Sequence, residues 1–487
     1  MCKREFLSAD VQAIICISGW KADSFLQFYA CSAEKGKRMI VLKRKDIGTS
    51  LIMFELFYVM LYSVVRDYLG LPGGISYFID VVNISVMIWL FFYKGTLREI
   101  FSLRLQSVLY AVLGLAAAAL LTAVLNAVPV LLVLWSYRNA MRFFPFFFAV
   151  IIFWDKKAAD TFSKAMIWLQ IPNGILCAIQ FFILDERGDF LGGIFGNIQG
   201  CNGFLCGYLF IVVTLVVEKY LHGKLNFFFM SASCLGSMVV AAMGELKVCF
   251  ITIPLIIIAS FVLNRPSLKT FALAAIISIA MIVSVDLIII YFPQWKDSFS
   301  SIKALIGVGN KVGGEYSISR LGAFSEINDL FFRNSFVKNA IGFGFGNCEY
   351  SSFDFLTSDF YNRYGSLNYR WFSHMMWFLQ TGYLGIICCA SFILSVFFWI
   401  TKMKFRFGDP GGVGSFGQIM CGLMIICFIY NATLTSEIGY IMFAALAMPF
   451  VYYKEIIYSS RNARNQKRSI PSELQQNGPE SEPFRMI

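Results

Sequence analysis

Long apolar segments recur along this chain of 487 residues, from residue 49 to residue 453. A helix of about 18 or more apolar residues is long enough to cross the hydrocarbon core of a bilayer. Hydrophobic residues make up 58% of the chain and charged residues 15%, which is far from the composition of an ordinary soluble domain. The sequence therefore predicts an all-α polytopic membrane protein.

Basic residues near the ends of the apolar segments predict how the chain crosses the membrane. About twelve spans are expected, at residues 49–65, 75–93, 106–135, 143–154, 165–184, 204–217, 226–243, 248–263, 270–292, 375–400, 418–434 and 438–453. With these spans the basic loops fall on one side at nearly every turn, and the positive-inside rule makes that side cytoplasmic. Both chain ends are expected on the same side.

Polar stretches divide the chain into five expected parts. They are a cytoplasmic N-terminal segment (1–48), transmembrane helices 1–9 (49–292), a large outer loop between helices 9 and 10 (293–373), transmembrane helices 10–12 (374–453) and a cytoplasmic tail (454–487). The tail is rich in serine, asparagine and glutamine, and it is predicted to be disordered.

Cysteine content and net charge both have a membrane explanation. Thirteen cysteines are present, but many lie within apolar spans and none forms a CxxC pair, so they are expected to be small core residues. The net charge of +11 comes from basic residues clustered beside helix ends. Topology explains this charge better than nucleic-acid binding, and neither a metal nor another cofactor is expected.

A few charged residues remain on the outer face, against the positive-inside rule. Arg138 and Arg142 are four residues apart, which places them on one face of a helix. The other outer candidates are Arg187, Asn202, Glu245, Lys247, Arg320, Arg333, Lys338, Arg363, Arg370 and His374.

Each of these residues also has a purely structural interpretation. Arginines at a helix end can reach lipid headgroups, a Glu and Lys in a turn can pair locally, and a lone histidine can simply begin a helix. Several segments nevertheless bring cations to one face, which favours an anion site, because guanidinium groups suit phosphate or diphosphate. A neighbouring histidine could deprotonate an attacking hydroxyl.

The order of these motifs resembles the O-antigen polymerase and O-antigen ligase superfamily. An outer YRNAMRFF segment is followed by GGIFGNIQGCNGFLCGYL and GELKVCFITIPL. A long outer loop then contains RLGAFSEINDLFFRNSFVKNAIGFGFGN and ends at SHMMWFLQTGYLG. The resemblance extends roughly from Tyr137 to Gly385, and it rests on the order and sidedness of the motifs.

The resemblance implies a GT-C-like membrane glycosyltransferase that uses neither a nucleotide sugar nor a metal. Such an enzyme takes a glycan from undecaprenyl diphosphate on the outer face of the bacterial inner membrane and transfers it, with inversion, to an acceptor hydroxyl. By this resemblance His374 is the catalytic base-like residue and Arg320 the catalytic arginine of the loop. The residues that would bind diphosphate or glycan are Arg138, Arg142, Arg187, Asn202, Glu245, Lys247, Arg333 and Gly344.

The chain matches the family pattern at some of these positions and departs from it at others. Arg333 and Gly344 have the RX10G spacing of polymerase loops. Arg187 lacks that spacing because residue 198 is isoleucine, which counts against a polymerase with two such loops. Met375 follows His374 where the ligases usually carry asparagine, which counts against a ligase.

A polymerase of a surface polysaccharide (O-antigen, capsule or exopolysaccharide) is therefore the first expectation, with a lipid-linked repeat unit as acceptor. The nearest alternative is an O-antigen ligase that uses lipid A core. A flippase or secondary transporter would instead use ionisable residues within spans, for which Glu55, Asp80 and Asp286 are candidates. A membrane scaffold would leave the outer cations unexplained. The expected partners are the undecaprenyl-diphosphate-linked oligosaccharide, membrane lipid and a protein that regulates chain length.

Overall fold

The computed structural model describes residues 44–264, 290 and 317–469, which form helices and no strand. Eight helices of this part of the chain are long and apolar enough to cross a membrane: α1 (Arg44–Leu69), α2 (Phe78–Phe92) with the short helix before it, α4 (Gln106–Leu125), α7 (Lys156–Trp168) continuing into α8 (Gln170–Phe182), α9 (Cys201–Leu221), α18 (Ser373–Phe407), α19 (Val413–Tyr430) and α20 (Ile438–Ser469). Three shorter apolar helices are α6 (Phe143–Phe153), α10 (Phe227–Met243) and α11 (Cys249–Leu263). The predicted all-α architecture with many apolar helices is confirmed.

The helices coincide with every predicted span except residues 270–292, which lie outside the described residues apart from Ile290. The total of twelve spans therefore stays a prediction. One predicted span, 106–135, is two helices, because α4 ends at Leu125 and Pro129 precedes a separate helix, α5 (Val130–Ser136).

The last helix runs further than expected. α20 continues to Ser469, past residue 454, where the tail was predicted to begin. Its residues still make contacts there, since the hydroxyl oxygens of Tyr458 and Ser102 lie 3.1 Å apart. Composition alone did not predict these last turns, because α20 becomes polar while it still contacts a neighbouring helix.

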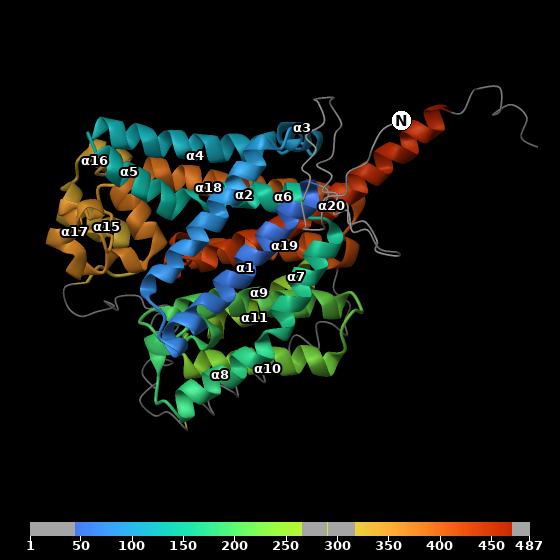
Figure 1. Ribbon diagram of the computed structural model, residues 1–487, viewed down its shortest axis with the longest axis horizontal. Helices are drawn as coiled ribbons and strands as arrows, with labels where there is room; N and C mark the ends of the chain where they lie inside the picture. Colours follow the sequence, from blue (N-terminus) through green and yellow to red (C-terminus); the bar gives the residue numbers. More distant parts are fainter. Residues whose placement is uncertain (1–43, 265–289, 291–316, 470–487) are drawn as a thin grey trace, which may run out of the picture.

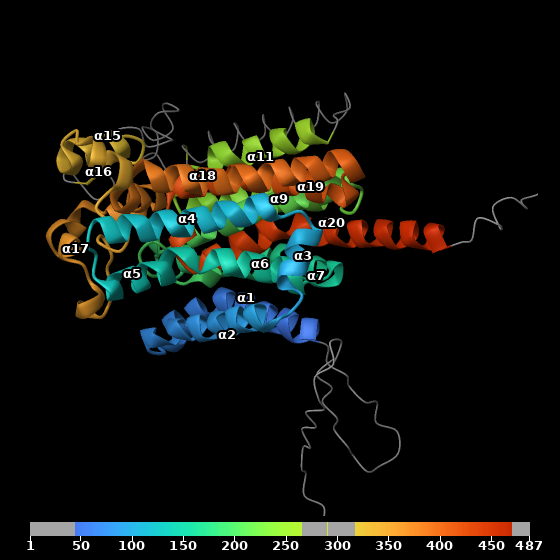
Figure 2. The same ribbon diagram turned by 90° about the horizontal axis from the view of Figure 1, so that it is seen from above.

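Helices α4, α9, α18, α19 and α20 run close to the longest axis of the molecule, while α1, α2 and α7 run obliquely to it (Figure 1). The same arrangement is seen from above, with α15, α16 and α17 together beyond one end of the bundle and the last turns of α20 beyond the other (Figure 2). The described part of the predicted outer loop thus caps one end of the bundle.

The short helix α6 lies at the centre of the bundle. Every residue of α6 except Pro145 is buried, as expected for a helix that is apolar on all faces. Its phenylalanine rings pack against α18 and α20: the ring centroids of Phe144 and Phe392 are 5.0 Å apart, and those of Phe143 and Tyr440 are 4.9 Å apart. This packing fixes the segment just before α6 against the first turn of α20.

A buried lysine satisfies the C-terminal carbonyls at the end of α6. Lys454 Nζ donates to the carbonyl oxygens of Ile151 and Trp154, both at 2.6 Å, and of Ile152 at 3.1 Å. We expect Lys454→Met to lower the free energy of unfolding by about 2–3 kcal/mol, because three buried carbonyls lose a charged donor. The midpoint of thermal unfolding in detergent would measure this. Lys402→Met, at an exposed lysine, is the control, and an equal effect of both variants would contradict the capping role.

The helix α18 is broken in a way that lets the outer loop dock on it. Gly382 has φ 59° and ψ −156°, so the helix is interrupted there. The carbonyls of Leu379 and Gln380, near this break, accept hydrogen bonds from the backbone N–H groups of Phe343 and Gly344 at 2.8 and 2.9 Å. The loop segment is thereby attached to α18 by main-chain hydrogen bonds.

Three alternating glycines make this docking possible. Gly342, Gly344 and Gly346 all have positive φ angles, of 65°, 96° and 104°. A Cβ at Gly342 would lie 2.6 Å from the backbone of Gln380, and one at Gly346 would lie 2.8 Å from the backbone of Leu132. The GFGFG sequence therefore serves to bring backbone into contact with α18 and α5.

The described part of the outer loop has a small core of its own. It contains α15 (Ala323–Ile327), α16 (Phe336–Ile341) and α17 (Asp359–Tyr364). The ring centroid of Phe378, on the first turns of α18, lies 4.6 Å from that of Phe324 and 5.3 Å from that of Phe332. The start of α18 therefore holds the cap in place.

Candidate functional site

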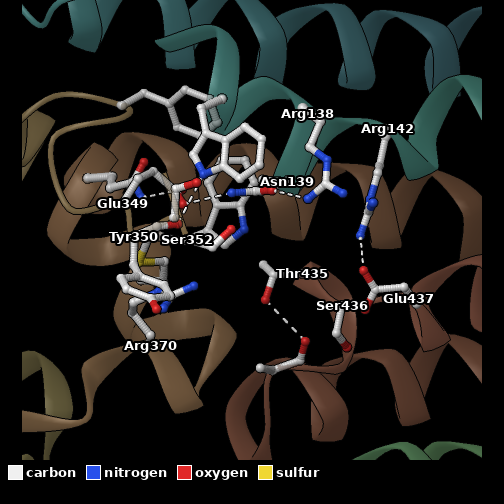
Figure 3. A pocket seen from close by; sticks show the side chains of 18 of the residues that line it. Arg138, Asn139, Arg142, Glu349, Tyr350, Ser352, Arg370, Thr435, Ser436 and Glu437 are labelled. Carbon is white, nitrogen blue, oxygen red and sulfur yellow. Dashed lines mark hydrogen bonds and ion pairs between the residues drawn. The ribbon is translucent and has the colours of Figure 1, made fainter. Parts of the chain in front are cut away.

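A cavity of about 370 Å³ lies where the cap meets the bundle. One wall comes from the end of α5 and the π-helical turn η2 (Tyr137–Met141), and another comes from α18 and the residues just before α20. Residues 349–352 of the outer loop close the third side. Figure 3 shows Arg138 and Arg142 reaching in from one wall, with Glu437 facing Arg142 and with Glu349 and Arg370 on the loop side.

Arg142 is the most deeply buried cation of this cavity, with its side chain 4% exposed. Its Nη1 donates to Asp80 Oδ1 at 2.9 Å and its Nη2 to Glu437 Oε1 at 3.3 Å. Burial alone would lower the pKa of this guanidinium, but Tyr440 and the two carboxylates outweigh burial and raise it. Arg142 is therefore a permanent charge, and its Nε has no hydrogen-bond partner among the described residues.

The ion pair with Arg142 also shifts the pKa of Glu437, in the opposite direction. Burial alone would raise the pKa of its carboxyl group, but the Arg142 guanidinium outweighs burial and lowers it. Glu437 is thus ionised at neutral pH and committed to Arg142.

Arg138 binds the same aspartate as Arg142. Its Nε lies 3.1 Å from both carboxylate oxygens of Asp80, and its Nη1 donates to Asn139 Oδ1 at 2.7 Å. The guanidinium carbon lies 4.9 Å from the ring centroid of Trp135 and 5.6 Å from that of Tyr77. The two arginines share one face, as their spacing predicts, and Asp80 on α2 compensates part of their charge.

Glu349 is a buried carboxylate held by neutral side chains. Its Oε1 accepts hydrogen bonds from Ser136 Oγ at 2.8 Å and Gln380 Nε2 at 3.1 Å, and its Oε2 accepts one from Asn139 Nδ2 at 2.9 Å. The residue is 3% exposed and lines the cavity. These hydrogen bonds connect the outer loop, which carries Glu349, to η2 and α18.

Arg370 is the cation of the cavity whose charge is least compensated. Its guanidinium carbon lies 4.8 Å from the ring centroid of Tyr350 and 5.4 Å from that of Tyr361. No carboxylate in the part of the chain that the structure describes forms an ion pair with it. An anion entering the cavity would find this guanidinium available.

His374 and Arg320 contact each other but do not line the cavity. His374 Nε2 lies 2.9 Å from the carbonyl oxygen of Arg320, and its Nδ1 lies 3.3 Å from that of Phe428. The Arg320 guanidinium lies over the Tyr430 ring, at 3.9 Å from its centroid. A neutral imidazole can donate to only one of these carbonyls, but both ring nitrogens face protein carbonyls and not the cavity, so neither is placed to take a proton from a substrate in this conformation. The expectation that His374 is the base does not fit this geometry.

Three of the other predicted residues gather in a second polar region near the start of α9 and the end of α10. Arg187 is 57% exposed and pairs with Asp185 at 2.7 Å. Asn202 Nδ2 donates to Asp189 Oδ1 at 3.0 Å and to the carbonyl of Gly244 at 3.2 Å.

Glu245, the third of them, has a left-handed backbone with φ 53°, and the N–H of Lys247 donates to its carbonyl at 2.9 Å. A Cβ at Gly188 would lie 3.4 Å from the Glu245 carboxyl carbon, which places the loop beside this turn. None of Arg187, Asn202, Glu245 and Lys247 lines the cavity, so the structure does not bring them together with Arg138 and Arg142.

Arg333 and Gly344, the pair with RX10G spacing, do not meet in the cavity either. Arg333 is exposed after a second π-helical turn, with φ 51°. A Cβ at Gly344 would lie 2.5 Å from Val128 Cγ2, so this glycine allows close packing of the loop on the end of α4.

Two carboxylates of the cavity were missed as site candidates by the sequence analysis, which searched the outer face for cations. Glu437 precedes the last span in TSEIGY, and Glu349 follows the alternating glycines in GNCEY. Glu437 directly precedes a predicted span, and this position was the signal that could have found it, whereas Glu349 lies within the predicted outer loop.

Three ionisable residues within predicted spans were the candidates for a flippase or transporter. Asp80 pairs with both arginines, and Asp286 lies outside the described residues. Glu55 on α1 is fully buried, and neither of its carboxyl oxygens has a hydrogen-bond partner among the described residues.

No model of a known protein family matches the chain, and no curated protein sequence matches it.

Proposed function

We propose that the chain is a membrane glycosyltransferase that polymerises a surface polysaccharide from a glycan linked to undecaprenyl diphosphate. The observation that carries the proposal is the convergence of Arg138, Arg142 and Arg370 on one cavity among apolar helices. The donor already bears a diphosphate leaving group, so the protein has to stabilise departing negative charge and orient an acceptor hydroxyl. Fixed guanidinium groups supply this stabilisation without a metal.

The three arginines have different parts in this proposal. Arg370 is uncompensated and takes the incoming diphosphate. Arg138 and Arg142 are held by Asp80 and Glu437, so their positions are fixed before substrate arrives. The cavity also lies at the N-terminus of α20, where the helix dipole favours an anion.

A lipid-linked substrate needs apolar space beside the polar cavity. A smaller apolar pocket shares Ala140 and Trp377 with the cavity wall. Its remaining lining is apolar and comes from α6, α18, α19 and α20 and from the segment before α20. This pocket measures only about 30 Å³, so neighbouring side chains would have to move before it held the first part of a prenyl chain whose diphosphate lies among the arginines.

Aromatic side chains line the same cavity. Trp135 donates its indole N–H to the carbonyl of Tyr350 at 3.0 Å, and the Tyr77 hydroxyl lies 2.9 Å from the Ser352 hydroxyl. These rings offer flat surfaces for sugar stacking, and their hydrogen bonds also connect the loop to α5 and to the short helix before α2.

The proposal is tested by replacing Arg370 with alanine in cells whose own gene for this chain has been deleted. We expect the ladder of long surface polysaccharide to disappear while single repeat units remain, because removing one charge-stabilising donor slows such reactions by about 100-fold or more. Polysaccharide gels would show the ladder, with protein levels measured in parallel. Arg363→Ala, at an exposed arginine of the same loop, is the control.

Other outcomes identify the alternatives. Lipid-linked polymer that accumulates while capped product is lost would indicate a ligase that acts on lipid A core. Lipid-linked units retained on the cytoplasmic side would indicate a flippase. A ladder unchanged by Arg370→Ala would contradict the proposed use of this cavity.

A further inference from the structure

We infer that Glu349 is the catalytic base that removes the proton from the acceptor hydroxyl. This inference rests on the proposed function and assigns a residue to its proton transfer. Two carboxylates line the cavity, Glu349 and Glu437, whereas the only histidine near it, His374, does not line it and has both ring nitrogens against carbonyl oxygens.

Glu437 is the poorer of the two candidates. It faces Arg142, whose guanidinium favours the ionised carboxylate and so opposes protonation. A base must gain a proton in the transition state, so this pairing weakens Glu437 for that role. Its place opposite Arg142 fits a residue that positions the arginine.

Glu349, unlike Glu437, forms no ion pair with a cation among the described residues. Its three donors, Ser136, Asn139 and Gln380, are neutral, and no described lysine or arginine pairs with it. A carboxylate has about four acceptor positions. Two donors occupy Oε1 and one occupies Oε2, so Oε2 keeps a position for a hydroxyl from the cavity.

The surroundings of Glu349 also accommodate its protonated form. Ser136 Oγ lies 2.8 Å from Glu349 Oε1 and 3.0 Å from Gln380 Oε1. When Glu349 is ionised, the serine hydroxyl can donate to it. The proton of the acceptor hydroxyl arrives on Oε2, which keeps a position open to the cavity, so the protonated carboxyl group can donate into the cavity while Ser136 and Gln380 still donate to Oε1. The proton can be held without leaving a buried polar group unpaired.

The cavity places Glu349 beside one arginine and across from another. Figure 3 shows Glu349 with Arg370 on the loop side, while Arg142 and Glu437 lie across the open centre. The acceptor oxygen attacks the anomeric carbon of the donor sugar, and the bond from that carbon to the diphosphate oxygen breaks. The bonding electrons leave with the diphosphate, and the hydroxyl proton passes to Glu349.

The test compares Glu349→Gln with wild type in purified protein, using lipid extract from the deletion strain as substrate. We expect turnover at saturating lipid to fall at least about 100-fold, the usual contribution of a general base. Binding of undecaprenyl diphosphate, measured separately, should change by less than about threefold, since the arginines remain. Glu326→Gln is the matched control, because Glu326 accepts a hydrogen bond from the Ser319 N–H at 3.0 Å in the same loop but does not line the cavity.

A purely structural role is distinguished by the pH profile and by Glu349→Asp. If Glu349 is the base, wild-type turnover falls toward acid pH, the residual turnover of Glu349→Gln loses that dependence, and Glu349→Asp recovers part of the rate. Near-normal turnover in Glu349→Gln would overturn the inference, as would an unchanged pH profile. A wild-type protein that transfers no glycan from the lipid extract would instead overturn the proposed function itself.

Discussion

Replacing Arg142 with alanine is expected to destabilise the protein by about 3–5 kcal/mol, because it removes one partner of a buried ion-pair network. Asp80 and Glu437 would both lose a charged donor within the bundle. The guanidinium also lies 5.0 Å from the ring centroid of Phe143 and 5.2 Å from that of Tyr440, so packing is lost as well. Thermal unfolding in detergent would show a large fall in the midpoint.

Arg363→Ala is the matched control, since Arg363 is exposed and substitutions at such positions change stability by about 0.5 kcal/mol or less. Arg142→Lys should recover only part of the loss, because an ammonium group cannot make the two diverging contacts of a planar guanidinium. If Arg142→Ala unfolds at the same temperature as Arg363→Ala, the network does not hold the helices together. A second variant, Arg142→Ala with Glu437→Gln, should be more stable than Arg142→Ala alone, because it removes the carboxylate that has lost its ion pair, whereas Asp80 still pairs with Arg138.

Hydropathy predicted most of the helices that the structure describes. The apolar segments coincide with helices because nothing else satisfies backbone groups in a long apolar stretch within lipid. What the sequence did not predict is where helices are interrupted. α18 is broken at Gly382 inside an apolar segment, and the π-helical turn η2 precedes α6, and both features depend on the outer loop that packs there.

The site was predicted only in part, for a physical reason. Arg138 and Arg142 were found because their spacing fixes a shared face. Arg370 could not be told from Arg333 or Arg363 by sequence, because all three are outer-loop arginines and only packing places one of them on the cavity. Glu349 is positioned by three residues distant in sequence, so no local pattern marks it.

Replacing Gly342 with alanine is expected to have the second large effect, on both folding and activity. Gly342 has φ 65° and ψ −155°, a conformation that costs a residue with a Cβ about 1–3 kcal/mol. The added Cβ would also lie 2.6 Å from the carbonyl oxygen of Leu379 and from the carbonyl carbon of Gln380. These atoms are backbone and cannot move aside, so docking of the loop on α18 is disrupted.

Gly408→Ala is the control that separates the cost of backbone strain from the cost of the close contact at Gly342. Gly408 has nearly the same backbone, φ 76° and ψ −168°, but a Cβ there would meet no atom within 4 Å. Both variants should therefore lose the strain energy, and Gly342→Ala should lose roughly a further 1–3 kcal/mol from overpacking. Because Gln380 donates to Glu349 and the same segment carries Glu349 to the cavity, turnover should fall in Gly342→Ala and not in Gly408→Ala. Equal unfolding midpoints and equal turnover in the two variants would mean that the loop does not need its contact with α18.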